Sequence, residues 1–157
     1  MKNYTKIKTS LEKHLSSLKE LNELNVVTNK KDFTSQIGEW LVAELYNGKR
    51  ATSGIQKDWD IETEFGYIQV KSHSKSITTS ARWSPIKYNI NAQINELIIV
   101  VFTPDYKLKE FYKVPWKMAL SLIKRQKHRD VINWDHLTDY RIEINQIPKQ
   151  ELVELFK

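Results

Sequence analysis

The sequence predicts an α/β domain in which helices flank a mixed β-sheet. Three stretches carry this prediction. Residues 59–74 have the pattern of a β-hairpin, and residues 34–47 have the apolar spacing of an amphipathic helix. Residues 97–103 form an almost continuous apolar run, which is typical of a central strand covered on both faces. The 157 residues fit one domain that is large enough for a sizeable core.

The first helix is expected over residues 9–24. Thr9 and Glu12 have the spacing of a capping box. Five leucines then recur along one slowly drifting stripe, namely Leu11, Leu15, Leu18, Leu21 and Leu24. We expect this stripe to pack against the core.

The second helix is expected over residues 34–47. Asp32 or Thr34 can cap its first turn, and Gly48 follows as a natural stop. The buried side is predicted from three apolar residues at helical spacing, namely Ile37, Leu41 and Leu45. Glu39 lies off this line, next to a glycine, and is a candidate functional acid.

The hairpin over residues 59–74 is the part of the chain around which the rest is organised. Both arms are rich in β-branched and aromatic residues, and the short connector contains Gly66, which can adopt a positive φ. Because side chains alternate across a strand, Gln69 and Lys71 point to one face, about 7 Å apart. Asp60 on the first arm can reach the same edge. An acid, an amide and a lysine that converge there indicate a functional site.

This order of residues resembles the PD-(D/E)XK nuclease superfamily, to which restriction endonucleases, Holliday-junction resolvases and Mrr-type enzymes belong. The resemblance rests on Asp60, on Gln69-Val70-Lys71 after the turn, and on Gly38-Glu39 in the preceding helix. It covers about residues 33–114. It implies a restriction endonuclease-like core, preceded by the leucine-rich helix and followed by a helical and strand extension over residues 115–157.

Two positions need comment. Gln69 stands where the commonest pattern of the superfamily has Asp or Glu, although Mrr-like branches carry Gln there. Asp58 and Asp60 both precede the turn at a suitable place. We assign the first acid to Asp60, because Ile61 continues an apolar strand towards the turn.

The resemblance implies a Mg²⁺-dependent endodeoxyribonuclease of the restriction, repair or recombination type, with Mn²⁺ as an alternative metal. Glu39 and Asp60 would supply the carboxylates that hold the metal, and the Gln69 amide and the Val70 carbonyl would add oxygen ligands. Lys71 would orient or activate the attacking water and stabilise the charge that develops on the phosphoryl oxygens. The predicted catalytic residues are thus Glu39, Asp60, Gln69 and Lys71.

Residues 65–95 contain neither Asp nor Glu, which is the most unusual charge pattern in the chain. The stretch combines cations, hydroxyls and aromatic rings, as a surface that follows phosphates does. The residues predicted to contact DNA are Ser72, His73, Lys75, Arg82, Trp83 and Lys87. A second basic cluster, at residues 124–129, has the pattern of a solvated helix end that could extend a DNA footprint.

The remaining elements follow from shorter patterns. Residues 109–114 alternate as a returning strand, and Pro115 starts a helix that runs to Arg125. Residues 139–144 alternate as an edge strand. Pro148 opens a closing helix. This helix is expected to dock through Leu152, Leu155 and Phe156.

Composition limits the class of partner. A net charge of +6 and a pI near 9.4 favour an anionic partner, most simply nucleic acid. The absence of cysteine excludes disulfides and thiolate zinc sites and suits a cytoplasmic location. No signal peptide opens the chain and the longest apolar run, residues 97–102, is too short to span a bilayer, so no membrane partner is expected.

Three alternatives stay open at this level. The protein is either the nuclease described above, a catalytically inactive nucleic-acid-binding module with a nuclease-like fold, or a protein-interaction domain. Gln69 is the residue that favours the inactive module. The oligomeric state is also open, with a homodimer among the alternatives.

Overall fold

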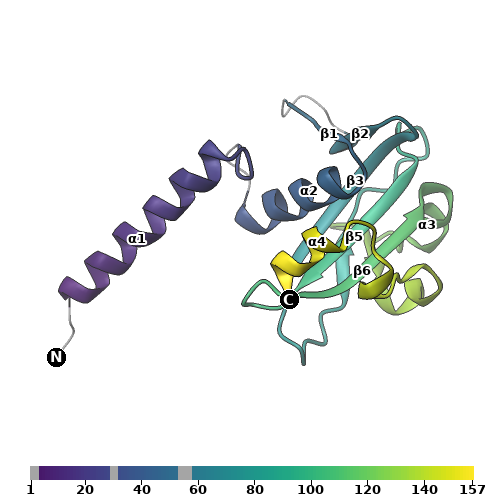
Figure 1. Ribbon diagram of the computed structural model, residues 1–157. Coiled ribbons are helices and arrows are strands. Elements are labelled where there is room, and N and C mark those ends of the chain that lie inside the picture. Colours follow the sequence, from purple (N-terminus) through teal and green to yellow (C-terminus); the bar gives the residue numbers. More distant parts are fainter. Residues whose placement is uncertain (1–3, 29–31, 53–57) are drawn as a thin grey trace.

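The computed structural model describes residues 4–28, 32–52 and 58–157 (Figure 1). Within these ranges, a mixed five-stranded sheet in the order β1-β2-β3-β5-β6 is flanked by helices on both faces. Its strands are β1 (Lys49–Arg50), β2 (Ile61–Thr63), β3 (Gly66–Ser74), β5 (Glu96–Phe102) and β6 (Leu108–Pro115). The predicted α/β architecture with a mixed, helix-flanked sheet is therefore confirmed.

The predicted hairpin consists of β2 and β3, which pair antiparallel with Ile61 opposite Ile68. Gly66 takes a φ of 128°, as the turn requires, and a Cβ there would lie 2.2 Å from Asn95 Oδ1. β3 runs parallel to β5, and β5 runs antiparallel to β6. The hairpin therefore forms one half of the sheet and places β3 near its centre.

β5 separates two apolar cores. One core contains Ile98, Val100 and Phe102 together with residues of α2, whereas the other contains Leu97, Ile99 and Val101. All six side chains are fully buried, as the apolar run predicted. Burial of each such side chain contributes roughly 1.5–3 kcal/mol, so this strand anchors the domain.

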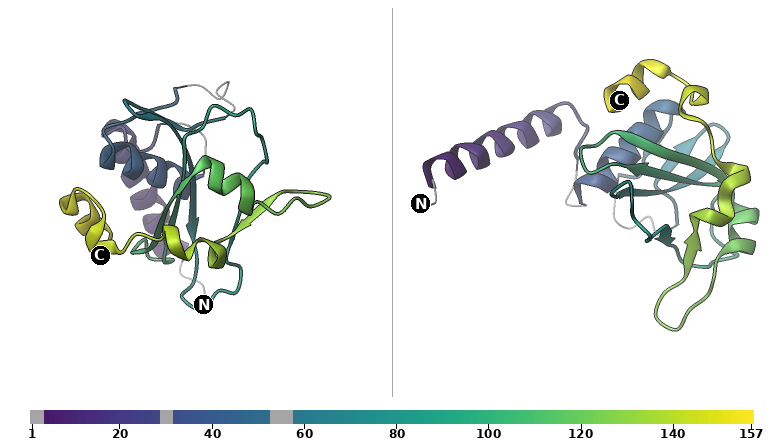
Figure 2. Two further views of the ribbon diagram at one scale, coloured as in Figure 1. Left: turned by 90° about the vertical axis from the view of Figure 1, so that its right-hand side faces the viewer. Right: turned by 90° about the horizontal axis from the view of Figure 1, so that it is seen from below.

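α2 (Phe33–Leu45) covers one face of the sheet, and its start and buried side agree with the prediction. Asp32 caps the helix, because its carboxylate accepts a hydrogen bond from Ser35 N at 3.0 Å. The three apolar residues predicted to face the core, Ile37, Leu41 and Leu45, are all buried. α4 (Gln150–Val153) and the 3₁₀-helix η3 (Glu154–Phe156) lie on the same face (Figure 2).

α1 (Tyr4–Glu23) differs from the prediction in its start and in its packing. It begins at Tyr4 rather than Thr9 and buries no residue. It extends away from the sheet, with Leu11 and Leu15 exposed by 59% and 64% (Figures 1 and 2). The expectation that its leucines pack on the core is wrong, because other elements already cover both faces of the sheet. No helix in the described ranges is long and apolar enough to cross a membrane.

α3 (Trp116–Leu122) follows Pro115 as predicted but ends before Arg125. Ile123 turns into an extended conformation and packs into the second core. Lys124 then pairs with Val131 through backbone hydrogen bonds of 2.8 and 3.0 Å. Residues 125–130 therefore form a loop at the tip of a short antiparallel ribbon, and the interpretation of this cluster as a helix end was wrong.

A small second sheet was not predicted. β7 (Val131–Asn133) pairs antiparallel with β4 (Trp83–Pro85), which lies within the acid-free stretch. These strands are only three residues long, too short for an alternating pattern to reveal.

The predicted edge strand at residues 139–144 is reduced to a single antiparallel bridge between Arg141 and Tyr112 of β6. This part of the chain contains the 3₁₀-helices η1 (Trp134–Tyr140) and η2 (Ile144–Gln146). In η1, Trp134 and Leu137 are three residues apart and both are fully buried, because a 3₁₀-helix places such residues on one face. In the closing helix, the predicted docking residue Leu155 is exposed, whereas Val153 is fully buried.

Candidate functional site

The candidate site lies where β3 extends beyond its partner β2. β2 pairs with β3 only as far as Ile68, whereas β3 continues to Ser74. Past this point a side chain replaces the missing strand, because Asp60 Oδ2 accepts a hydrogen bond from Val70 N at 2.8 Å. Asp60 N also donates to Ile68 O at 2.9 Å. Two backbone contacts therefore fix Asp60 at the edge of β3.

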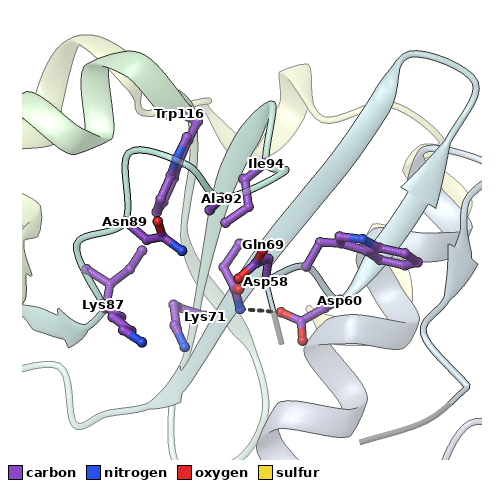
Figure 3. Close-up of a pocket in the computed structure, with 11 residues that line it drawn as sticks. Asp58, Asp60, Gln69, Lys71, Lys87, Asn89, Ala92, Ile94 and Trp116 are labelled. Atoms are coloured by element: carbon purple, nitrogen blue, oxygen red, sulfur yellow. Dashed lines mark hydrogen bonds between the residues drawn. The ribbon is translucent and has the colours of Figure 1, made fainter. Parts of the chain in front are cut away.

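Gln69 faces Asp60 across this edge. Gln69 Nε2 donates to Asp60 Oδ2 at 2.5 Å and lies 3.4 Å from Val70 O (Figure 3). A carboxylate can only accept hydrogen bonds, so the NH₂ group of the amide points at Asp60 and the amide oxygen lies on the other side. In this arrangement Gln69 holds the Asp60 carboxylate in place.

Glu39 reaches the same edge because α2 packs unusually close to β3. A Cβ at Gly38 would lie only 1.7 Å from Ser72 Oγ, so no side chain fits at this position. Glu39 is the next residue and is 7% exposed. The glycine before the predicted helix acid thus has a physical reason, since it lets the helix bring that acid to the strand.

A cavity of about 350 Å³ contains all four residues predicted to be catalytic. Its walls include Glu39, Asp60, Gln69, Val70, Lys71 and Ser72. These residues come from α2, from the segment that precedes β2, and from β3. The structure therefore brings the predicted catalytic residues together.

The donors in this cavity suit Mg²⁺, which proteins bind through one or two carboxylates while it keeps several waters. Glu39 and Asp60 supply two carboxylates, and Gln69 and Val70 carry further oxygens. In the described part of the chain, no group of three or more His, Cys, Asp or Glu side chains gathers. Waters and substrate oxygens would therefore have to complete the coordination.

Lys71 also borders two neighbouring cavities. The first, of about 180 Å³, reaches from Asp58 past Lys87 and Asn89 to Trp116 (Figure 3). The second, of about 460 Å³, lies between Lys71 and residues 126–130. Lys71 therefore stands at the junction of three hollows.

The basic loop at residues 125–130 projects from the domain beside this junction (Figure 2). Two of its cations cover aromatic rings, with Arg129 4.3 Å from the Trp83 ring centroid and Arg125 4.9 Å from that of Tyr88. Its one acid, Asp130, accepts a hydrogen bond from Tyr88 N at 2.9 Å. Sequence reasoning did not place this loop near Lys71. The only feature of the sequence that could have indicated this position is the apolar segment after the loop, which forms β7.

His73, which was predicted to contact DNA, lies within a hydrogen-bonded cluster. Its Nε2 lies 2.7 Å from Ser84 Oγ, which also accepts a hydrogen bond from Trp134 Nε1 at 2.9 Å. Burial lowers the pKa of His73, the charges of Lys75 and Lys71 act in the same direction, and together they bring it to about 4. His73 is therefore neutral at pH 7 and contributes to packing.

Arg82, a second predicted DNA contact, is held by two carboxylates. It donates to both oxygens of Glu110 at 2.8 and 3.1 Å and to Asp135 Oδ1 at 2.6 Å. Burial alone would raise the pKa of Glu110, but the hydrogen bonds from Arg82 and Tyr112 outweigh it and lower the pKa. β6 and η1 supply these acids. The stretch at residues 65–95 contains no acid of its own, but the fold places acids from other elements next to it.

The other predicted DNA contacts lie in different settings. Ser72 Oγ is buried against α2 and has no hydrogen-bond partner within the described ranges. Trp83 lies beneath Arg129, and Lys75 continues the chain after β3. Lys87 is exposed and borders both cavities next to Lys71. Of these residues, Lys87 is the one best placed to meet a phosphate near the site.

No protein-family model matches the sequence, and no curated protein matches it either, so the chemistry of the site has to indicate the function. That chemistry consists of two carboxylates, an amide and a lysine around one cavity, next to exposed basic residues. Such a set can hold a hard cation against a phosphate and deliver a water to it.

Proposed function

We propose that this protein is a Mg²⁺-dependent endodeoxyribonuclease, with Mn²⁺ as an alternative metal. The observation that carries the proposal is the convergence of Glu39, Asp60, Gln69 and Lys71 on one cavity at the open edge of β3. A helix acid, an acid before the hairpin and Gln-x-Lys on its second strand also follow the order implied by the resemblance to the PD-(D/E)XK superfamily. This order supports a restriction endonuclease-like core.

Asp60 and Glu39 would hold the metal, with the Val70 carbonyl as a further ligand. The metal, when bound, would lower the pKa of a coordinated water and neutralise charge on the scissile phosphate. The side chain of Lys71 ends in a compact cation with three hydrogen-bond donors. It is therefore suited to orient the attacking water and to stabilise the charge on the phosphoryl oxygens. Val70 N holds the Asp60 carboxylate in register with the strand that carries Lys71.

Gln69 has two roles open to it. In the present arrangement its NH₂ group holds Asp60, which makes it a positioning residue. A half-turn of the terminal amide, whose torsion is broad and two-fold, would present its oxygen to the cavity as a ligand. Either role leaves the site one negative charge short of a three-carboxylate centre, so metal binding is expected to strengthen when the substrate phosphate arrives.

DNA is the proposed substrate because the cations near the site are exposed and border Lys71. Lys87 and the loop at residues 125–130 line the two neighbouring hollows. In the described part of the chain, the cations of this loop form no ion pair with a carboxylate. They are therefore available to replace counterions on a phosphate backbone.

The test is a cleavage assay on supercoiled, branched and single-stranded DNA, with Mg²⁺, with Mn²⁺ and with EDTA. Cleavage that requires a metal and stops with EDTA would support the proposal. Absence of cleavage with either metal on every substrate would refute it.

The second candidate is a nucleic-acid-binding module without catalysis. The hydrogen bond between Gln69 and Asp60 favours it, because this bond stabilises the Asp60 carboxylate without any metal. Salt-dependent DNA binding without cleavage would select this candidate. Absence of both binding and cleavage would leave the protein-interaction domain.

A further inference from the structure

α1 presents an apolar face that no other element of the described chain covers. The helix extends away from the sheet, and none of its residues is buried (Figures 1 and 2). Its large apolar side chains recur every three or four residues, so they share one side of the helix. They are Tyr4, Ile7, Leu11, Leu15, Leu18 and Leu21, of which the first four are exposed by between 50% and 72%.

The junction between α1 and the domain holds the helix in this direction. Arg50 of β1 donates hydrogen bonds to Asn25 O and, at 2.9 Å, to Val26 O. Asn22 Nδ2 donates to Val27 O at 2.8 Å, and Asn25 follows the helix with a φ of 57°. Val26 also packs against the core that contains α2. These contacts fix the C-terminal end of α1, so its apolar face is held out from the domain.

The charges of α1 are arranged against the dipole of the helix. Its first turn contains Lys6 and no acid, whereas its last turn contains Glu20 and Glu23 and no base. An isolated helix is stabilised by the reverse arrangement, with acids at the N-terminal end and bases at the C-terminal end. A second helix that runs antiparallel would place its acidic end beside the basic end of the first. Such a pair offsets the unfavourable charges at both ends.

We propose that α1 pairs with α1 of a second copy in antiparallel orientation, so that two copies of the chain form a symmetric dimer. A two-fold axis brings the same face of both helices together, as an interface between two identical subunits requires. The inference goes beyond the proposed function, because it concerns an interface and not the cavity at β3.

One register aligns the apolar residues of the two helices. Tyr4 lies opposite Leu21 of the second copy, and Ile7 lies opposite its Leu18. Burial removes roughly 60–120 Å² of each apolar side chain from water, so the side chains of both stripes together bury on the order of 1,000 Å². A specific interface needs about this area. The paired stripes are therefore large enough for a dimer.

The polar side of α1 favours a protein partner over a membrane surface. Helices that lie on membranes carry many Lys and Arg residues on the polar side, which are attracted to anionic lipids. In α1 the bases are mixed with acids along the helix. Lys8 Nζ lies 3.9 Å from Glu12 Oε1, and Lys19 Nζ lies 3.8 Å from Glu23 Oε1. A polar face with both signs of charge gains little from an anionic membrane.

Sedimentation equilibrium of the full chain measures the association directly. The wild type should form dimers as its concentration rises. Leu11→Lys places a charge within the apolar face of both copies and should raise the dissociation constant at least about 100-fold, because two buried leucines are lost. The domain should stay folded by near-UV circular dichroism, since α1 buries no residue. Ser16→Lys is the matched control on the polar side and should leave the dissociation constant unchanged. A wild type that stays monomeric up to millimolar concentration would overturn the proposal.

Engineered cysteines test the orientation, because the natural chain contains none. Ile7 and Leu18 are eleven residues apart, which is about 16 Å along a helix, whereas a disulfide needs Cα atoms within about 7 Å. A mixture of Ile7→Cys and Leu18→Cys should therefore give disulfide-linked dimers on a non-reducing gel, and either variant alone should not. Linkage of each variant only with itself would show a parallel pair and overturn the proposal.

Charge reversal tests the ends of the two helices. Lys6→Glu gives one helix a favourable N-terminal charge, but in the dimer it places this acid beside Glu20 of the second copy. The dissociation constant should rise about 5-fold, and Glu20→Lys in the same chain should restore it. Within one helix the two residues are about 21 Å apart, so an effect inside the monomer would not show this rescue. A dimer that Lys6→Glu tightens would overturn the antiparallel arrangement.

The remaining outcomes separate this proposal from its alternatives. If the wild type stays monomeric but co-sediments with vesicles of equal parts phosphatidylcholine and phosphatidylserine, the apolar face binds membranes and the dimer falls. If the chain dimerises but cuts no DNA with Mg²⁺ or Mn²⁺, the interface stands and the nuclease proposal falls. If a monomeric chain cuts DNA, the nuclease stands and the interface falls.

Discussion

The two ends of β3 carry similar polar side chains but put them in opposite situations. Gln69 and Lys71 border at least two cavities each. His73, two residues further along the same face, also borders one of them, but its ring is bonded to Ser84 and packed against Trp134. The difference lies in what covers the strand. β4, β7 and η1 close over the His73 end, but β2 stops short of the Gln69 end. A polar side chain on a strand thus becomes available for chemistry where no neighbouring element closes over it.

We call the Gln69 end of β3 the open end and the His73 end the closed end. The largest effect on DNA cleavage is expected when the open end loses the carboxylate of Asp60. Asp60→Asn keeps the shape of the side chain and an acceptor for Val70 N, but removes the charge that would hold the metal. Cleavage should fall by about a thousand-fold or more, whereas the melting temperature should change little. The measurement is the cleavage rate on supercoiled DNA alongside thermal unfolding.

Asp58→Asn is the matched control, since Asp58 borders only the neighbouring cavity. Full activity of Asp60→Asn with Mg²⁺ would contradict the assignment. If Asp58→Asn alone is inactive, the metal-binding acid is Asp58.

Substitutions at the closed end should change the free energy of unfolding and not the activity. Arg82→Ala leaves Glu110, whose side chain is only 6% exposed, without its main cationic partner. Loss of one partner of a buried pair should lower the free energy of unfolding by about 3 kcal/mol, measured by urea denaturation. DNA binding by the folded variant should be unchanged.

Lys87→Ala is the matched control in the same acid-free stretch, because Lys87 is exposed and borders Lys71. This variant should keep its stability to within about 0.5 kcal/mol. The dependence of its DNA affinity on salt concentration should be weaker, because binding should release about one counterion fewer. If Arg82→Ala instead flattens the salt dependence without loss of stability, Arg82 contacts DNA as the sequence pattern suggested.

The pH dependence of stability tests the enclosed state of His73. The unfolded chain protonates this histidine near pH 6.5, but burial lowers the pKa in the fold to about 4. Between these values the unfolded chain binds more protons, so the free energy of unfolding falls as the pH decreases from about 6.5 to 4. The loss is roughly 3 kcal/mol, measured by urea unfolding at several pH values.

His73→Gln keeps a polar group near Ser84 but cannot titrate, so its stability should depend less on pH over this range. Glu110, whose pKa is lowered from 4.5, loses its contribution only below about pH 4.5 and does so equally in both proteins, so it does not affect the comparison. Equal slopes for the wild type and the variant would show that His73 titrates normally in the fold.

The sequence predicted those parts of the molecule that depend on local pattern. The hairpin, the helix capped by Asp32 and the buried strand β5 all follow from spacing within about fifteen residues. The same holds for Asp60, Gln69 and Lys71, which the strand period and the turn bring to one edge, whereas Glu39 was predicted from the resemblance and reaches this edge through the packing of α2 at Gly38.

What could not be predicted depends on partners that are distant in the sequence. The acids that neutralise Arg82 come from β6 and η1, and the ribbon that carries the basic loop exists only because Val131 returns to Lys124. The error about α1 has the same origin. The spacing of its leucines shows that one face of the helix is apolar, but not that the sheet has room to pack against that face. These errors are all errors of tertiary context.

The smallest effect, and the finest test of the open end, is expected for Gln69→Glu. In the metal-free protein the substitution replaces the hydrogen bond between Gln69 Nε2 and Asp60 Oδ2 by two carboxylates at close range. Like charges disfavour each other, so the melting temperature without metal should fall by a few degrees relative to the wild type. Mg²⁺ should restore it, because a ligand that binds only the folded state stabilises that state. The extra charge should tighten Mg²⁺ binding, and cleavage should be kept or rise a few-fold. If Mg²⁺ stabilises neither protein, the open end of β3 does not bind this metal. If the wild type is inert and Gln69→Glu cuts DNA, the natural protein is the binding module.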